Sequence, residues 1–161
     1  MISAWRIIKQ KHVKAAFTGE GARLYGGRWN SPGRPMVYTS ESRALALAEI
    51  LVHLESSGPL SRYVAFRVEI DDGFAADVLS GDLPRNWRAD PAPKRLQAIG
   101  DDWLASQTSA VLRVPSAVVA GEFNYLLNPF HPDFAKLQIS GPEKFSIDKR
   151  LQSAKVRYND D

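Results

Sequence analysis

Glycine, arginine and aromatic residues alternate along residues 17–34, FTGEGARLYGGRWNSPGR. Glycine permits positive φ angles and lets a ligand approach the main chain closely. An arginine guanidinium presents a planar set of donors that suits phosphate oxygens, and an aromatic ring offers a flat face to a base. The segment therefore predicts a loop that holds a nucleotide-like anion. Its candidate contacts are Arg23, Tyr25, Arg28, Trp29 and Arg34.

A single carboxylate follows this loop on a predicted helix. Residues 35–39 indicate a short strand that carries Tyr38, and residues 41–54 indicate a helix with Ser40 as its N-cap. The helix is apolar on nearly every side, so we expect it to be buried. Glu49 lies in its middle, where an unpaired charge is costly. Glu49 should therefore perform chemistry or form a structural ion pair, for which the candidate partners are Arg23, Arg28 and Arg67.

The other predicted elements are mostly strands. Strands are indicated at 4–9 (an edge-type strand that contains Arg6), 62–70, 74–79, 137–140 and 144–147, and β-branched runs that favour strands lie at 110–115 and 117–120. Helical segments are indicated at 11–16, at 90–106 (beginning at Asp90-Pro91 and weakened by Gly100) and near Phe134, while 56–59 should end the helix that carries Glu49. Strands outnumber helices and do not alternate with them regularly. This pattern predicts an α+β fold, with one domain at 1–150 and a polar tail at 151–161 that we expect to fray.

Composition narrows the function classes. The net charge of +3 and the isoelectric point near 9.3 suit an anionic substrate or an acidic partner. Lysine and arginine form no dense stripe, so we expect no direct DNA binding. The absence of cysteine excludes disulfides and thiolate metal sites and fits a cytoplasmic protein. No apolar run approaches the roughly 20 residues of a membrane span, so we expect no membrane partner.

The common nucleotide and metal motifs are missing. The glycine segment lacks the G-x-x-x-x-G-K-[ST] pattern of a P-loop, and Leu24 stands where a dinucleotide-binding turn has its third glycine. The three histidines are His12, His53 and His131, which are far apart in the sequence. His131 and Asp133 more readily structure a loop than bind a metal. We therefore expect no metal.

Four segments together resemble the RES domain, a family named for its arginine, glutamate and serine. They are GEGARLYGGRWNSPG, VYTSESRALALAEILVHL, VPSAVVAGEFNYLLNP and HPDF, and the resemblance extends from about Trp5 to about Ile147. It implies a fold similar to ADP-ribosyltransferases, with a mixed β-sheet core and a few flanking helices. It also implies a toxin of a type II toxin–antitoxin system, whose partner is an Xre-type helix-turn-helix antitoxin.

The resemblance further implies that NAD⁺ is consumed as a substrate, with no cofactor. Some members are described as hydrolysing NAD⁺, some as phosphorolysing it, and one type as transferring ADP-ribose to a protein. The family's catalytic residues fall on Arg28, Tyr38, Glu49 and Ser116. Asn124, in the matching E-x-N segment, is a weaker correspondence.

Cleavage of the nicotinamide–ribose bond builds positive charge on the ribose, and the nicotinamide leaves neutral without needing a proton. Glu49 can stabilise that charge, and Arg28 can hold the pyrophosphate or ribose. Tyr38 can stack on nicotinamide, and Ser116 can donate to the nicotinamide amide or a ribose hydroxyl. Trp29 and Tyr25 are candidates for stacking or for shaping the pocket, and Arg6 is a further candidate for lining it.

Two alternatives stay open at this point. The first is a protein ADP-ribosyltransferase, because the sequence does not identify the acceptor. The second is a non-catalytic module that binds an anion or nucleic acid through the basic and aromatic loop.

Overall fold

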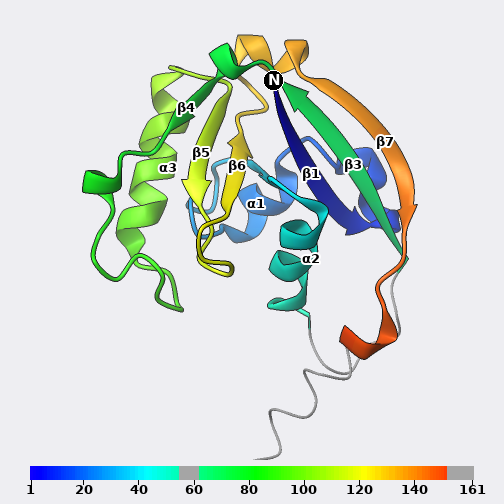
Figure 1. Cartoon of the computed structure of the whole chain (residues 1–161). Coiled ribbons are helices and arrows are strands. Elements are labelled where there is room, and N and C mark those ends of the chain that lie inside the picture. The colour runs from blue at the N-terminus through cyan, green and yellow to red at the C-terminus, as the bar shows by residue number, and fades with distance from the viewer. Residues whose placement is uncertain (55–61, 152–161) are drawn as a thin grey trace, which may run out of the picture.

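The computed structural model describes residues 1–54 and 62–151, and in them the chain forms one seven-stranded mixed sheet (Figure 1). The strands are β1 (Ile2–Lys9), β2 (Val37–Ser40), β3 (Tyr63–Ile70), β4 (Ala75–Asp77), β5 (Val111–Pro115), β6 (Phe123–Leu127) and β7 (Gln138–Phe145). Their order is β4-β5-β6-β2-β1-β3-β7, and only β4 and β5 are parallel. This confirms an α+β fold with a mixed sheet and few helices.

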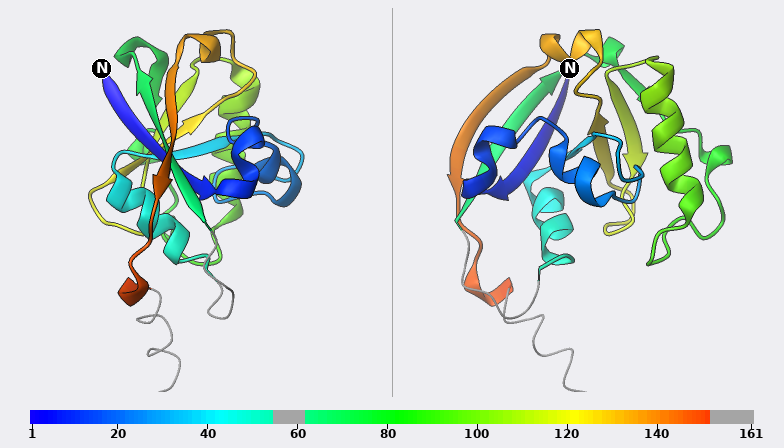
Figure 2. Two further views of the ribbon diagram at one scale, coloured as in Figure 1. Left: turned by 90° about the vertical axis from the view of Figure 1, so that its right-hand side faces the viewer. Right: turned by 180° about the vertical axis from the view of Figure 1, so that it is seen from behind.

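The sheet diverges into two halves at β2. This strand pairs with β6 along all four of its residues, but it meets β1 through the single pair Trp5 and Ser40. The halves β4-β5-β6 and β1-β3-β7 therefore splay apart, as Figures 1 and 2 show. The candidate site residue Tyr38 and its neighbour Ser40 lie on β2, where the two halves meet.

Two helices pack on the same face of the sheet, the one that also carries Tyr38. Helix α3 (Lys94–Ser106) buries Leu96, Trp103 and Leu104 against β5 and β6. Helix α2 (Arg43–Leu51) buries Ala46 against β1 and β3. Because side chains alternate along a strand, the paired residues Ser40 and Asn124 face the same side as these helices. The two strand ends thus present polar groups between α2 and α3.

Several predicted elements have different limits. Strand β1 is internal, since β2 and β3 flank it, and is not an edge strand. The glycine segment is not all loop, because it contains helix α1 (Glu20–Tyr25). Helix α2 starts at Arg43, where the side chain of Ser42, and not that of Ser40, accepts a hydrogen bond from the Leu45 amide (3.0 Å).

Burial of α2 is also less complete than predicted. Only Leu45 and Ala46 are buried in it, while Ala44 is exposed and the following Val52 is 51 % exposed. The helix has the sheet on one side only, so its opposite face meets solvent although the residues there are apolar.

Three further predictions are wrong in detail. Helix α3 begins at Lys94 and not at Asp90, because Ala92 precedes Pro93, which disfavours helical geometry there. Residues 117–120 form a turn and not a strand. The predicted closing pair of strands is the single strand β7, which pairs with β3 across a register shift between Ala65 and Arg67.

The remaining elements agree with the sequence. The predicted strand 62–70 corresponds to β3 and the β-branched run 110–115 to β5, and the short helical segments correspond to the 3-10 helices η1 (Gln10–Ala15) and η4 (Pro132–Lys136). The predicted helix stop at 56–59 and nearly all of the polar tail lie outside the described residues. In the described ranges, none of the helices combines the length and the apolar character needed to cross a bilayer.

Candidate active site

Glu49 lies in a network of polar side chains from four separate elements. Its Oε1 atom accepts a hydrogen bond from Asn124 Nδ2 (2.7 Å) and one from Ser116 Oγ (3.1 Å). Both bonds reach one oxygen, and no residue in 1–54 or 62–151 donates to Oε2. Glu49 is half-buried, so that second oxygen remains available to a ligand.

The hydroxyl of Ser116 is fixed by the turn that follows β5. It accepts hydrogen bonds from the backbone amides of Val118 (3.1 Å) and Val119 (3.0 Å), and Ser116 is only 1 % exposed. These two amides turn the chain back, which is why the β-branched run 117–120 does not extend as a strand. Because both lone pairs are engaged, the hydroxyl proton points to Glu49.

Asn124 is oriented from its other end. Ser40 Oγ donates to Asn124 Oδ1 (2.8 Å), so the amide group of Asn124 is turned toward Glu49. Ser40 and Asn124 are register partners on β2 and β6. The serine that the sequence suggested as a helix cap is therefore part of the site.

Arg28 lies in a tight turn that closes with the Gly27 amide donating to the Asn30 carbonyl (3.0 Å). Its Nη1 atom donates to the backbone carbonyls of Trp87 (2.9 Å) and Ala89 (3.0 Å). The guanidinium is thus held against the segment before α3 by main-chain oxygens. Only Nη1 makes these bonds, so the Nε and Nη2 donors of the guanidinium can bind an anion.

Tyr38 supports this turn from β2. Its hydroxyl accepts from the Trp29 amide (3.1 Å) and donates to Asn30 Oδ1 (2.6 Å). Burial raises the pKa of Tyr38 well above its ordinary value, while the bond from the Trp29 amide opposes that rise. The phenol is therefore neutral and supports the Arg28 turn, which leaves only its ring for stacking on a ligand.

The remaining predicted residues, Trp29, Tyr25 and Arg6, lie in three different environments. Trp29 is 2 % exposed and packs in the core beneath α3, so it shapes the site from below and offers no free ring face. Tyr25 is 84 % exposed at the end of α1. Arg6 donates to the carbonyls of Ala16 (2.6 Å) and Tyr38 (2.8 Å), and burial lowers its pKa to about 10. It holds β2 and the chain after η1 and does not join the network around Glu49.

Helix α3 holds the Arg28 turn through residues that the sequence did not indicate. Gln97 Nε2 donates to the carbonyls of Gly27 (3.0 Å) and Asn30 (3.2 Å), and Asp101 Oδ1 accepts from the Ser31 amide (3.0 Å). A Cβ atom at Gly100 would lie 1.7 Å from the carbonyl oxygen of Trp29. A glycine inside an otherwise regular helical pattern was the one available signal of this close approach.

The suggested ion pairs of Glu49 do not form. Arg23 pairs with Glu20 (2.6 Å) and Arg67 with Glu69 (2.5 Å), and no ion pair joins Arg28 to Glu49 in the described part of the chain. The predicted site thus consists of two groups, Glu49 with Ser116 and Asn124, and Arg28 with Tyr38 and Trp29. Tyr38 and Ser40, two residues apart on one face of β2, connect the groups.

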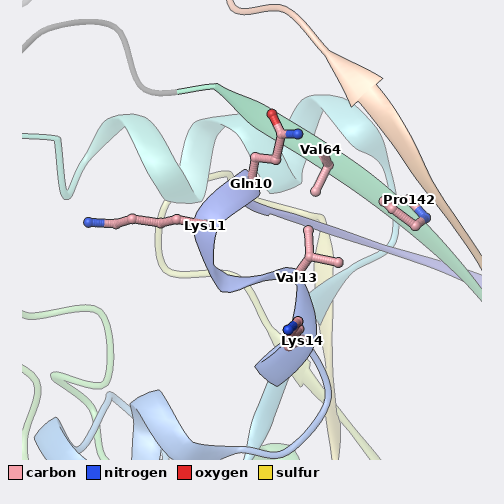
Figure 3. A pocket seen from close by; sticks show the side chains of 6 residues that line it. All are labelled: Gln10, Lys11, Val13, Lys14, Val64 and Pro142. Atoms are coloured by element: carbon pink, nitrogen blue, oxygen red, sulfur yellow. The ribbon is translucent and has the colours of Figure 1, made fainter.

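The described surface contains two notable hollows. One of about 480 Å³ lies beside the site, lined in part by Trp87, Pro115 and Phe123. The other, of about 340 Å³, lies between η1 and strands β3 and β7 (Figure 3). In Figure 3, Val13, Val64 and Pro142 surround the same space and Lys11 points away from it. None of the candidate site residues lines this second hollow.

His131 has the loop-structuring role that was expected. Its Nδ1 accepts from the Asp133 amide (3.0 Å) at the start of η4, and its Nε2 lies 3.0 Å from the Gln107 carbonyl. Across residues 1–54 and 62–151, no three histidine or carboxylate side chains are grouped as metal ligands.

A model of the family described as "RES domain" matches residues 3–148. The chain belongs to the RES domain family. A Toxin Res from Yersinia enterocolitica is 42 % identical over 149 residues, covering 92 % of this chain and 98 % of that protein. A Prs ADP-ribosylating toxin from a Sphingobium species is 40 % identical over 155 residues, covering 92 % and 96 %.

A solved structure has a similar fold. The chain is similar to one in the crystal structure of the M. tuberculosis MbcT-MbcA toxin-antitoxin complex, with a TM-score of 0.69 and 18 % identity. The match covers 95 % of this chain and 87 % of that one. At this identity the likeness concerns the fold.

Proposed function

We propose that this RES protein is the toxin of a toxin–antitoxin system and that it degrades NAD⁺ by cleaving the nicotinamide–ribose bond. The observation that carries the proposal is the Glu49 carboxylate, which accepts from Asn124 and Ser116 through Oε1 while Oε2 has no donor among the described residues. Family membership and relatives named as toxins support the toxin role in this proposal.

The proposed role of Glu49 is electrostatic. Nicotinamide is cationic in NAD⁺ and leaves as a neutral molecule, so the protein need not protonate it. Positive charge develops on the ribose instead, and a fixed carboxylate stabilises that charge without reorganising during the step. Ser116 and Asn124 hold the carboxylate, and Oε2 is then placed to accept from a ribose hydroxyl or from the attacking nucleophile.

Arg28 is proposed to bind the pyrophosphate. Two carbonyls hold its Nη1, and its remaining donors suit phosphate oxygens. The Tyr38 ring, which lies on the face of the sheet covered by α3 and supports the Arg28 turn, is proposed to contact nicotinamide. The reaction so described uses protein side chains and NAD⁺ as its substrate, and we propose that it takes place in the cytoplasm.

The acceptor is proposed to be water or phosphate. A protein acceptor is the second candidate, and the similar relative named Prs ADP-ribosylating toxin favours it. We propose an antitoxin of the Xre type as the partner; the fold likeness to a chain of a toxin–antitoxin complex supports an antitoxin in general.

The test is incubation of the full chain with NAD⁺, with and without phosphate, followed by mass analysis of the products. Free nicotinamide with ADP-ribose indicates hydrolysis, and free nicotinamide with a phosphorylated ADP-ribose indicates phosphorolysis. Mass added to a protein from a cell extract indicates transfer. Intact NAD⁺ after prolonged contact with folded protein would refute the proposal and would favour a binding module.

A further inference from the structure

A pocket beside the candidate site is lined by charged and aromatic residues that have no role in the proposed reaction. It is the hollow of about 480 Å³ between the end of β4, the segment 78–87 and the ends of β5 and β6. Its wall includes the cationic side chains of Arg85 and Arg113 and the aromatic side chains of Trp87 and Phe123. Arginines together with flat rings match a ligand that carries both a phosphate and a base.

The pocket adjoins the Arg28 group of the candidate site. Trp87 lines it, and the Trp87 carbonyl accepts from Arg28 (2.9 Å). Pro115 and Phe123 line it as well, and they directly precede Ser116 and Asn124 in the chain. Because side chains alternate along a strand, Arg113 and Phe123 face the side of the sheet opposite to Asn124, so a ligand in the pocket would lie close to the Arg28 turn through Trp87 and not against the Glu49 network.

Arg113 is positioned to bind an anion. Its guanidinium lies 3.6 Å from the centre of the Phe123 ring, which fixes the plane of the group. Its Nη1 contacts Asp77 Oδ1 at 3.2 Å, and the Asp77 side chain is 65 % exposed. An exposed pair of this kind is weak, so a phosphate can replace the Asp77 carboxylate. The Nε atom of Arg113 is buried and lacks a partner in the described residues.

We propose that this pocket binds the adenosine monophosphate group of a nucleotide, with Arg113 and Arg85 contacting the phosphate and Trp87 contacting the base. The group can come from the AMP half of NAD⁺ or from free AMP. Its assignment to NAD⁺ rests on the proposed function, whereas binding of AMP does not.

The first experiment titrates the full chain with AMP, adenosine and ribose 5-phosphate by calorimetry. AMP should bind more tightly than either fragment. Arg113→Gln and Arg85→Gln should each weaken AMP binding about tenfold, the usual effect of losing a charged hydrogen bond. Asp77→Asn should tighten it, because the competing carboxylate is gone.

Arg67→Gln is the matched control. Arg67 also lies on a strand, pairs with one carboxylate, Glu69, and has an aromatic neighbour, Trp5, 5.8 Å away. It lies on β3, on the other half of the sheet, and AMP binding should be unchanged in this variant. Absence of AMP binding, or equal AMP affinity in the wild type and in both pocket variants, would overturn the proposal.

The second experiment identifies the source of the AMP group. If the pocket holds the AMP half of NAD⁺, Arg113→Gln raises the KM for NAD⁺ about tenfold and leaves the KM for nicotinamide mononucleotide unchanged, and AMP competes with NAD⁺. AMP binding without competition assigns the pocket to free AMP. Failure to release nicotinamide would refute the proposed reaction alone, since the calorimetric titration needs no turnover.

Discussion

Glu49 and Arg28 are both candidates for catalysis, but other side chains hold Glu49 while backbone carbonyls hold Arg28. Asn124 and Ser116 orient the carboxylate, and Ser40 orients Asn124 in turn. Around Arg28, the turn at Gly27–Asn30 fits against α3, and the guanidinium then meets two carbonyls. The Glu49 group can therefore be altered one side chain at a time, whereas the Arg28 group depends on how whole segments pack.

The largest expected effect is at the contact between α3 and the Arg28 turn. Gly100→Ala places a methyl group 1.7 Å from the Trp29 carbonyl oxygen, so helix and turn must separate. We expect a loss of about 3 kcal/mol or more in the free energy of unfolding, measured by chemical denaturation. Gly21→Ala on α1 is the control, since nothing lies within 4 Å of its added methyl group and its stability should not fall. Equal stability of the two variants would mean that α3 does not clamp the turn.

Substitution of Glu49 should lower the activity of the protein and leave its stability unchanged. Glu49→Gln keeps an oxygen that accepts from Asn124 and Ser116 but removes the negative charge. We expect nicotinamide release to fall about a hundredfold or more, with a melting temperature close to that of the wild type. The control is Glu69→Gln, because Glu69 also accepts from a serine hydroxyl, that of Ser3 at 3.1 Å. A Glu49→Gln variant that unfolds would assign this carboxylate a structural role.

Tyr38→Phe tests the support of the Arg28 turn and its dependence on pH. The change leaves the Trp29 amide and Asn30 Oδ1 without their partner, and we expect a loss of about 1–2 kcal/mol at neutral pH. Burial raises the pKa of Tyr38, so the folded state keeps the phenol proton to a higher pH than the unfolded state does. The contribution of Tyr38 to the free energy of unfolding is therefore fully present below about pH 10 and declines above that pH.

The measurement for Tyr38 is urea denaturation of both proteins across neutral and alkaline pH. The wild-type advantage should shrink as the pH rises above about 10, the ordinary tyrosine value. An advantage that stays constant into that range would show that the hydroxyl is not protected by the fold.

The smallest expected effect concerns the start of α2. Ser42→Ala removes the side chain that accepts from the Leu45 amide, and we expect a loss of about 1 kcal/mol, measured by thermal melting. Glu49 lies nearly two turns further along the helix, so nicotinamide release should persist. A large loss of release in this variant would show that the Glu49 group depends on the position of the whole helix after all.

The sequence predicted the fold class and the strand β3 because residues 62–70 alternate regularly between apolar and polar side chains and the four quoted segments have a family-like order. It also selected Glu49, Ser116 and Asn124, which the fold brings into contact from elements 67 and 75 residues apart. The prediction that α2 is buried was wrong for one face of the helix, because burial depends on which other elements cover a helix and not on its sequence alone. The contact of Gln97 with the Arg28 turn spans 70 residues, and no local pattern indicates its partner.

The way in which Arg28 is held has a practical consequence for labelling. Main-chain oxygens receive the guanidinium, so the side chain at position 89 can change while its carbonyl remains in place. Ala89 is exposed, and the chain contains no cysteine. Ala89→Cys would therefore introduce a single thiol next to the arginine, where an attached fluorophore would report ligand arrival in real time.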